Sequence, residues 1–258
     1  MKKSFKYFIT CLLLICALMA CTMSVSAAKK TKAAKKTVID KSRLVDLKDP
    51  TNVHSTYFKA TVKYDVKVKN ITTKKYMTLK KGTQIITYLR KYSSPVKAVY
   101  KKNQKIEVSG KALRYTGYYY DSKVDYTREA KEKFINSRGY SSNTHYLIWV
   151  NHYTCKVNLF YGSKGNWKLR KTFPCVVGAY ITPTPRGVYH VQTTTTNYSG
   201  SYGLRFTYSY RLMKGNWIHK RLGSPMSYPA SHGCIRMNIP DLTYVYQHCG
   251  VGTTVLSH

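Results

Sequence analysis

Acidic residues are scarce in this chain of 258 residues, which has 10 Asp and Glu against 44 Lys and Arg and a formal net charge of +34 at pH 7. Glycine and proline are also few, at 15 and 8 residues, and this excludes a collagen-like or low-complexity chain. The hydrophobic fraction is 43%, and 14% of the residues are aromatic, which is too much for a disordered polycation. The length allows one large domain or two small ones, each with a core of its own.

Long apolar runs are absent apart from one near the N-terminus, residues 9–23, and this excludes a multi-pass membrane protein. The run follows a short basic patch and precedes small residues suited to a signal peptidase, so residues 1–27 are predicted to be a secretory signal. Two alternatives remain open: an uncleaved anchor, and a lipid on Cys21, whose preceding residues resemble a lipobox. In each case we expect the rest of the chain to act outside the cytoplasm, at the cell wall.

The excess of positive charge predicts anionic surroundings. For an exported protein these are wall polymers, anionic lipid or an acidic surface, and we expect no nucleic-acid partner and no stable protein partner. The lysines are spread along the chain, which favours a generally cationic surface over a single recognition stripe.

A mostly β fold is predicted, in four parts after the signal. Residues 28–52 form a basic linker, residues 53–125 a small β-barrel-like module, residues 126–142 a linking helix, and residues 143–258 a β-rich catalytic domain. Within the module, residues 76–90 resemble the hairpin of small bacterial Src-homology-like domains, which implies a binding or spacer role. Alternating runs predict strands at residues 62–68, 84–90, 96–101, 105–108, 145–151, 156–162 and 169–178.

Helix signals occur twice. Residues 127–138 have Thr127 as a capping residue and are followed by Gly139 as a stop. Residues 241–248 also have a helical pattern, and we expect Cys249, directly after them, to be buried.

Four cysteines remain after the predicted signal, and no C-x-x-C pair occurs among them, which excludes a zinc ribbon. A turn at residues 162–165 would bring Cys155 close to Cys175, and both a disulfide and two buried thiols remain open. The chain also lacks a Gly-rich phosphate loop and an H-E-x-x-H motif, so we expect no metal and no cofactor.

The most informative stretch is S-H-G-C-I-R-M-N, residues 231–238, with W-I-H-K at residues 217–220 before it. A thiol attacks only as the thiolate, and a free cysteine is mostly protonated at neutral pH, so Cys234 needs a base or a positive charge nearby. His219 or His232 could supply the base. Gly233 allows a tight turn in which successive N–H groups point at one oxygen, as acyl transfer requires.

These residues, together with T-P-T-P-R-G at residues 182–187, resemble the YkuD-type catalytic domain of L,D-transpeptidases. The resemblance implies that Cys234 is the nucleophile and His219 its general base, and that Ser231, His232 and Gly233 complete the motif. The N–H groups of Gly233 and Cys234 would be the oxyanion donors, and Arg236 would orient the site or bind a carboxylate. Only 11 residues separate His219 from Ser231, which is slightly fewer than is usual in that family.

The reaction implied by the resemblance is acyl transfer between peptidoglycan stem peptides through a thioester, which gives 3→3 cross-links, or carboxypeptidase activity when water is the acceptor. The resemblance also implies that a carbapenem acylates Cys234. An alternative is a non-catalytic, cationic wall-binding protein with a degenerate enzyme fold. A papain-like peptidase is disfavoured, because there the cysteine precedes its histidine in the chain.

Overall fold

The computed structural model describes residues 57–88, 90–101, 104–209, 214–221 and 227–258. The predicted signal, its alternatives and the basic linker lie outside these residues. Within the described part of the chain, no helix is long and apolar enough to cross a membrane.

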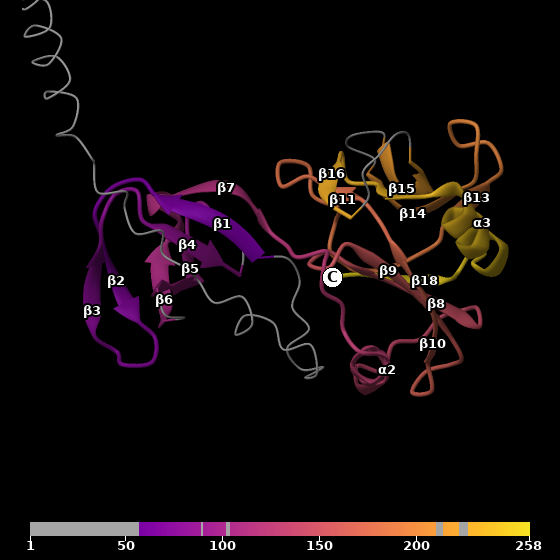
Figure 1. Ribbon diagram of the computed structural model, residues 1–258, viewed down its shortest axis with the longest axis horizontal. Helices are drawn as coiled ribbons and strands as arrows, with labels where there is room; N and C mark the ends of the chain where they lie inside the picture. The colour runs from indigo at the N-terminus through magenta and orange to yellow at the C-terminus, as the bar shows by residue number, and fades with distance from the viewer. Residues whose placement is uncertain (1–56, 89, 102–103, 210–213, 222–226) are drawn as a thin grey trace, which may run out of the picture. The chain divides into compact units, whose positions relative to one another are not determined.

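The first part of the described chain is a single antiparallel sheet (Figure 1). Its strands are β1 (Tyr57–Val62), β2 (Val66–Asn70), β3 (Tyr76–Leu79), β4 (Gln84–Thr87), β5 (Pro95–Tyr100), β6 (Gln104–Ser109) and β7 (Leu113–Tyr119), in the order β3-β2-β6-β5-β4-β1-β7. All seven strands contribute to one buried cluster, so the sheet encloses its own core. The predicted β-rich module is thus confirmed, although among the described residues no ladder pairs the edge strands β3 and β7.

The expected strand at residues 62–68 is wrong, because the chain bends between β1 and β2. The carboxylate of Asp65 in this bend accepts hydrogen bonds from Lys80 Nζ at 2.7 Å and from the Lys81 backbone N–H at 2.8 Å. Satisfying this carboxylate ties the bend to the turn between β3 and β4. The alternating pattern does not reveal this, because a bend of three residues keeps the apolar positions in phase.

The linking helix is confirmed as α2 (Arg128–Ser137). The Thr127 hydroxyl accepts a hydrogen bond from the Ala130 N–H at 3.2 Å, as an N-cap residue should. Gly139 ends the helix with a φ of +65°, a conformation that costs glycine little.

The predicted catalytic domain begins with a five-stranded sheet in the order β10-β9-β8-β18-β12. Its strands are β8 (Tyr146–Asn151), β9 (Lys156–Tyr161), β10 (Lys168–Pro174), β12 (Gly187–His190) and β18 (Thr254–Ser257). Both faces of β8 are buried: Leu147 and Trp149 pack with α2, whereas Ile148 and Val150 face a second core on the opposite side. Figure 1 shows α2 on one side of this sheet and the strands of a second sheet on the other.

The second sheet has the order β13-β14-β15-β17 and is accompanied by a parallel pair, β11 and β16. The bounds are β11 (Val177–Gly178), β13 (Thr193–Thr195), β14 (Gly203–Ser209), β15 (Lys214–Lys220), β16 (Pro229–Ser231) and β17 (Ile235–Met237). Helix α3 (Ile239–His248) buries Leu242 and Val245 in the core between the sheets. Cys249 follows the helix and is buried, as predicted.

Cys155 and Cys175 are neighbours, and both are free thiols. The Cys175 N–H donates to the Cys155 carbonyl at 2.9 Å, as the predicted hairpin requires. Burial raises the pKa of Cys155 to about 12 and raises that of Cys175 as well. Neither thiol is therefore a nucleophile at neutral pH.

Candidate active site

The parallel strands β15 and β17 place the predicted nucleophile and the predicted base on the same face of the second sheet. In the ladder between β15 and β17, Ile218 is opposite Ile235, and His219 is opposite Arg236. Since side chains alternate along a strand, the two isoleucines point into the core and His219 and Arg236 share the other face. Cys234, directly before β17, lies next to this face, where its sulfur receives a hydrogen bond from the Trp217 backbone.

The thiol of Cys234 is half-buried, and this sets its acidity. Burial raises the pKa of the thiol. Three contacts act in the opposite direction: the hydrogen bond from the Trp217 backbone, the charge of Arg236 and a hydrogen bond from the Tyr198 side chain. Cys234 is the cysteine that is least buried among the four, so it combines access with groups that stabilise a thiolate.

His219 is neutral at pH 7. Burial is the larger cause that lowers its pKa to about 4, and the charge of Arg236 acts in the same direction. A hydrogen bond with the Lys220 backbone opposes these effects. An imidazole that is neutral at working pH can accept a proton, which is what a general base requires.

Tyr198 is a site residue that the sequence did not reveal. Its ring lies 4.6 Å from the ring of Trp217 and 4.9 Å from the ring of His219, measured between centroids. Its side chain hydrogen-bonds Cys234, and burial raises the pKa of its hydroxyl, which therefore stays protonated and able to donate. The chain has 25 tyrosines, and only the pairing of β13, β14 and β15 places this one against the thiol.

The motif loop is held by Ser231. This buried hydroxyl donates to the Cys234 carbonyl and accepts the Gly233 N–H at 3.1 Å. The Gly233 N–H, predicted to face an oxyanion, is therefore already engaged within the loop. His232 is exposed, and no hydrogen bond joins its side chain to the described part of the chain.

Gly233 fits a position where a side chain would not. Its φ is +112°, and a Cβ atom there would lie 2.5 Å from Nδ2 of Asn216. The Asn216 amide is itself fixed, because its Oδ1 accepts a hydrogen bond from the Thr207 hydroxyl at 2.7 Å. The glycine thus lets the motif loop pass close to β15.

The segment T-P-T-P-R-G, residues 182–187, is joined to the motif loop by hydrogen bonds. The Thr182 hydroxyl donates to the Ser231 carbonyl at 3.0 Å, and the same carbonyl accepts the Ala179 N–H at 2.8 Å. The Thr184 hydroxyl accepts the Gly178 N–H at 2.8 Å, which joins this segment to β11. Hydrogen bonds from residues 182–184 therefore join this segment to the motif loop and to β11.

The surroundings of the thiol are basic. Arg236 acts on Cys234, His219 and Tyr198 through its charge. Nε of Arg205 and Nη1 of Arg221 are buried and have no hydrogen-bond partner among the described residues. Residues 143–258 contain a single acidic residue, Asp241. Such a site suits an anionic substrate, because almost no carboxylate side chain of the domain competes with the substrate for these arginines.

Among the described residues, no group of three or more His, Cys, Asp and Glu side chains is placed to hold a metal ion.

A search of curated proteins finds no match to this chain. Among solved structures, a fused Zn-dependent amidase, peptidase and peptidoglycan-binding domain protein from Clostridium acetobutylicum is 25% identical, over 51% of this chain and 59% of that one, with a TM-score of 0.41. The L,D-transpeptidase from Mycobacterium smegmatis is 13% identical, over 65% of this chain and 68% of that one, with a TM-score of 0.37. L,D-transpeptidase 1 from Mycobacterium tuberculosis is 18% identical, over 43% and 60%, with a TM-score of 0.33.

The chain thus spans less than two thirds of the length of the first and third of these structures. A family model matches residues 145–256, which include His219, the motif loop and Arg236, and it is that of YkuD, the L,D-transpeptidase catalytic domain. In residues 145–256 this chain therefore carries a catalytic domain of the YkuD family of L,D-transpeptidases.

Proposed function

We propose that this protein is a peptidoglycan L,D-transpeptidase that acts through a thioester on Cys234 and forms 3→3 cross-links between stem peptides. The observation that carries the proposal is the shared face of Cys234 and His219, where the Tyr198 side chain hydrogen-bonds Cys234 and its ring packs against the neutral imidazole. The same chemistry with water as acceptor gives L,D-carboxypeptidase activity. The reaction requires neither metal nor cofactor.

In the first half-reaction, the Cys234 sulfur attacks the carbonyl carbon of the third stem residue while its proton passes to His219. The C–N bond to the terminal D-alanine then breaks, and the leaving amine takes the proton from His219. The charge of Arg236 stabilises the thiolate, and because it destabilises the imidazolium it favours the return of the proton from His219 to the leaving amine. The products are free D-alanine and an acyl-enzyme.

In the second half-reaction, a side-chain amine of a neighbouring stem attacks the thioester carbonyl and gives up a proton to His219. The C–S bond breaks, and the sulfur leaves as a thiol after taking this proton. Each half-reaction passes through a tetrahedral oxyanion. We assign its stabilisation to the Cys234 N–H, because the Gly233 N–H is engaged by Ser231.

Arg236 binds a substrate carboxylate in this proposal, with Arg205 at the edge of the same face. Arg205 stacks over the Trp217 ring, with 5.8 Å between its Cζ atom and the ring centroid, and its Nε atom is buried without a partner among the described residues. A carboxylate that reached this nitrogen would remove the cost of leaving it unpaired. We further propose that the protein is exported and acts at the cell wall, as the predicted signal indicates.

The test is cross-linking of purified disaccharide-tetrapeptides by the wild type and by Cys234→Ser, followed by mass spectrometry of the products. We expect dimers, free D-alanine and an acyl-enzyme with the wild type, and a decrease in rate of at least about a thousandfold with the variant. Equal product from both proteins would overturn the assignment of Cys234 as the nucleophile, and no product from either would overturn the proposal and favour a non-catalytic wall-binding protein.

Acylation by a carbapenem gives an independent readout on the same residue. Intact-mass spectrometry should show one adduct on the wild type and none on Cys234→Ser. An adduct that maps to another cysteine would contradict the assignment of the nucleophile.

A further inference from the structure

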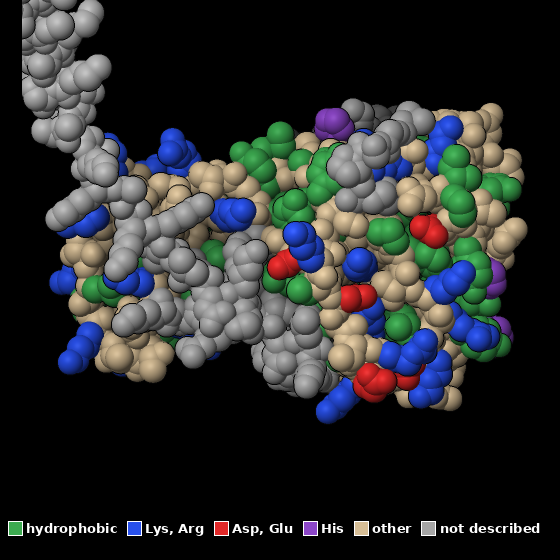
Figure 2. All heavy atoms as spheres, viewed as in Figure 1, with side chains coloured by type: hydrophobic (Ala, Val, Ile, Leu, Met, Phe, Trp, Pro, Cys, Tyr) green, Lys and Arg blue, Asp and Glu red, His purple; other side chains and the backbone are tan. Residues whose placement is uncertain are grey.

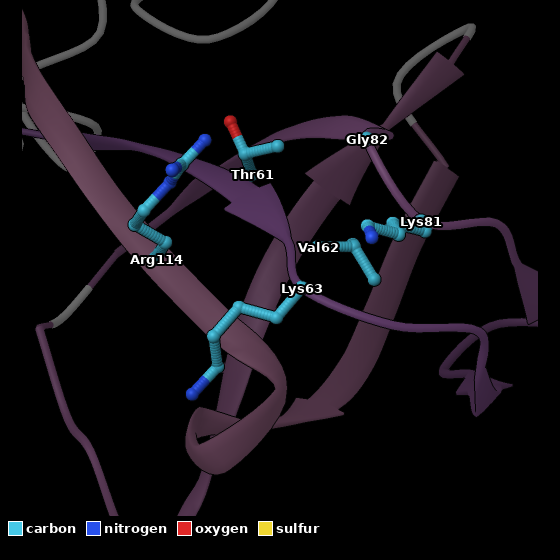
Figure 3. A pocket seen from close by; sticks show the side chains of 6 residues that line it. All are labelled: Thr61, Val62, Lys63, Lys81, Gly82 and Arg114. Atoms are coloured by element: carbon cyan, nitrogen blue, oxygen red, sulfur yellow. The ribbon is translucent and has the colours of Figure 1, made fainter.

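A hollow of about 250 Å³ lies on the N-terminal sheet, far in sequence from the residues of the proposed reaction. We call it the basic hollow, and it is lined by Thr61, Val62, Lys63, Lys81, Gly82 and Arg114 (Figure 3). Half of its lining residues are cations, and none is acidic or aromatic.

The backbone fixes where these residues lie. Thr61 in β1 is the direct cross-strand partner of Arg114 in β7, so their side chains share one face. The Gly82 N–H donates to the Val62 carbonyl at 2.9 Å, which brings the turn between β3 and β4 against the end of β1. Gly82 has a φ of +83°, as the third residue of a type II turn requires, and this turn presents Lys81.

The charges of the basic hollow are not neutralised within the described part of the chain. The side chains of Lys63, Lys81 and Arg114 are exposed, and none of them forms an ion pair or a hydrogen bond with a described residue. The nearest acidic residue in sequence, Asp65, is already paired with Lys80 at 2.7 Å.

The rest of the sheet adds to this positive charge. Residues 57–119 contain sixteen Lys and Arg, and only two acidic residues, Asp65 and Glu107. Glu107 lies between Lys69 and Lys97 in the ladders of β6 with β2 and β5. Figure 2 shows Lys and Arg side chains over much of the visible surface, with acidic side chains in few places. A ligand with repeated negative charges would therefore be attracted along the sheet as well as to the hollow.

The arrangement of the three cations favours a chain of anions over a single ion. In Figure 3 the ends of the Lys63, Lys81 and Arg114 side chains lie around the hollow and do not meet at one point. Lys, Arg and Thr side chains are usual partners of phosphate oxygens. A ligand that needed its bases stacked would require aromatic side chains, which are absent from the lining.

We propose that the basic hollow binds a linear phosphodiester polymer whose repeating unit has no aromatic ring, of the type of poly(glycerol phosphate). Its successive phosphates would contact Arg114 with Thr61, Lys63 and Lys81, and the short spacer between them would occupy the hollow over Val62 and Gly82. Such a site would hold the protein on an anionic polymer without involving the Cys234 site.

The test measures binding of purified poly(glycerol phosphate) to the full chain by isothermal titration calorimetry at several salt concentrations. The hollow variant is Lys63→Ala, Lys81→Ala and Arg114→Ala together. The matched control is Lys75→Ala, Lys101→Ala and Lys105→Ala, which removes the same charge from exposed positions of the same domain outside the hollow. Circular dichroism checks that both variants are folded, which we expect because all six side chains are exposed.

We expect the hollow variant to bind about tenfold more weakly and with a shallower salt dependence, since each phosphate that is no longer neutralised by a cation means about one fewer counterion released on binding. The control should change affinity by less than about threefold. Equal weakening in both variants would show binding by overall charge, and no weakening in either would place the ligand elsewhere; each overturns the proposal. Polyglutamate and a single-stranded oligo(dT) serve as competitors, and equal affinity for either one would overturn the choice of ligand.

Discussion

The N-terminal sheet and the catalytic domain bury their strands in different ways. Strands of the first sheet such as β2 and β6 alternate between buried and exposed side chains, because this sheet is covered mainly on one face. Exceptions are Ile86 in β4 and Val99 in β5, which are buried in a different cluster. In the catalytic domain β8 and β9 are buried almost throughout, because α2 and the second sheet cover both faces of their sheet. The exposed face of the first sheet carries many lysines, whereas the second sheet of the catalytic domain packs one face on the doubly covered sheet and carries His219, with Cys234 directly before β17, on its other face. A scaffold covered on both sides thus holds the sheet on which burial changes the pKa values of Cys234 and His219.

The sharpest comparison is between two glycines with positive φ, one in each region. Gly233→Ala should abolish most activity and lower the free energy of unfolding by about 2 kcal/mol, because strained backbone costs roughly 1–3 kcal/mol and the new Cβ would meet Asn216 Nδ2 at 2.5 Å. Gly82→Ala should cost only about 1 kcal/mol and leave activity intact, since nothing lies within 4 Å of its Cβ position.

Urea unfolding and cross-linking rates measure both variants. A larger loss of activity in Gly82→Ala than in Gly233→Ala would show that activity does not depend on the close approach of the motif loop to β15.

The second-largest expected effect is that of acid, which should destabilise the catalytic domain more than the N-terminal sheet. Burial lowers the pKa of His152 to about 3 and that of His219 to about 4, both in the catalytic domain, whereas residues 57–119 contain no histidine. The unfolded chain takes up these protons near pH 6.5 and the folded chain only near pH 3 to 4, so folding stability falls as pH decreases between these values.

Hydrogen exchange followed by mass spectrometry at about pH 7 and pH 4.5, on either side of the range in which an unfolded histidine titrates, can locate the effect. We expect protection to decrease in β8 and β15 more than in β5 and β6, after correction for the intrinsic rates. His152→Gln should reduce the difference, and an equal decrease in both sheets would contradict the role of these histidines.

The smallest expected effects come from a pair of Tyr→Phe changes. Tyr198→Phe removes the hydroxyl that hydrogen-bonds Cys234 but keeps the ring against Trp217, so kcat/KM should fall about tenfold with stability nearly unchanged. Tyr115→Phe removes a hydroxyl that donates to the Lys91 carbonyl at 2.8 Å, and it should cost about 1 kcal/mol of stability without changing kcat/KM.

Steady-state kinetics and thermal melting distinguish the two variants. A change in activity for Tyr115→Phe, or none for Tyr198→Phe, would reverse the assignment of a catalytic and a structural hydroxyl.

Local signals in the sequence predicted the helix capped by Thr127, most strands and the motif at Cys234, since each depends on residues within a few positions. Tyr198 could not be found in this way, because its contact with Cys234 depends on the pairing of β14 with β15 and of β15 with β17. The sequence also did not reveal that the Gly233 N–H donates a hydrogen bond to the Ser231 hydroxyl. The motif S-H-G-C is compatible with both a bonded and a free N–H group at this position. Bends such as that at Asp65 depend on a partner 15 or 16 positions away.

Because His219 and the residues after Cys234 belong to adjacent strands of one ladder, their spacing is set by main-chain pairing and not by the connection between them. Residues could be added to or removed from that connection without moving the imidazole relative to the sulfur, which accounts for a segment of 11 residues serving where longer ones are usual. An engineer could therefore change the length of this connection while His219 and Arg236 stay in register.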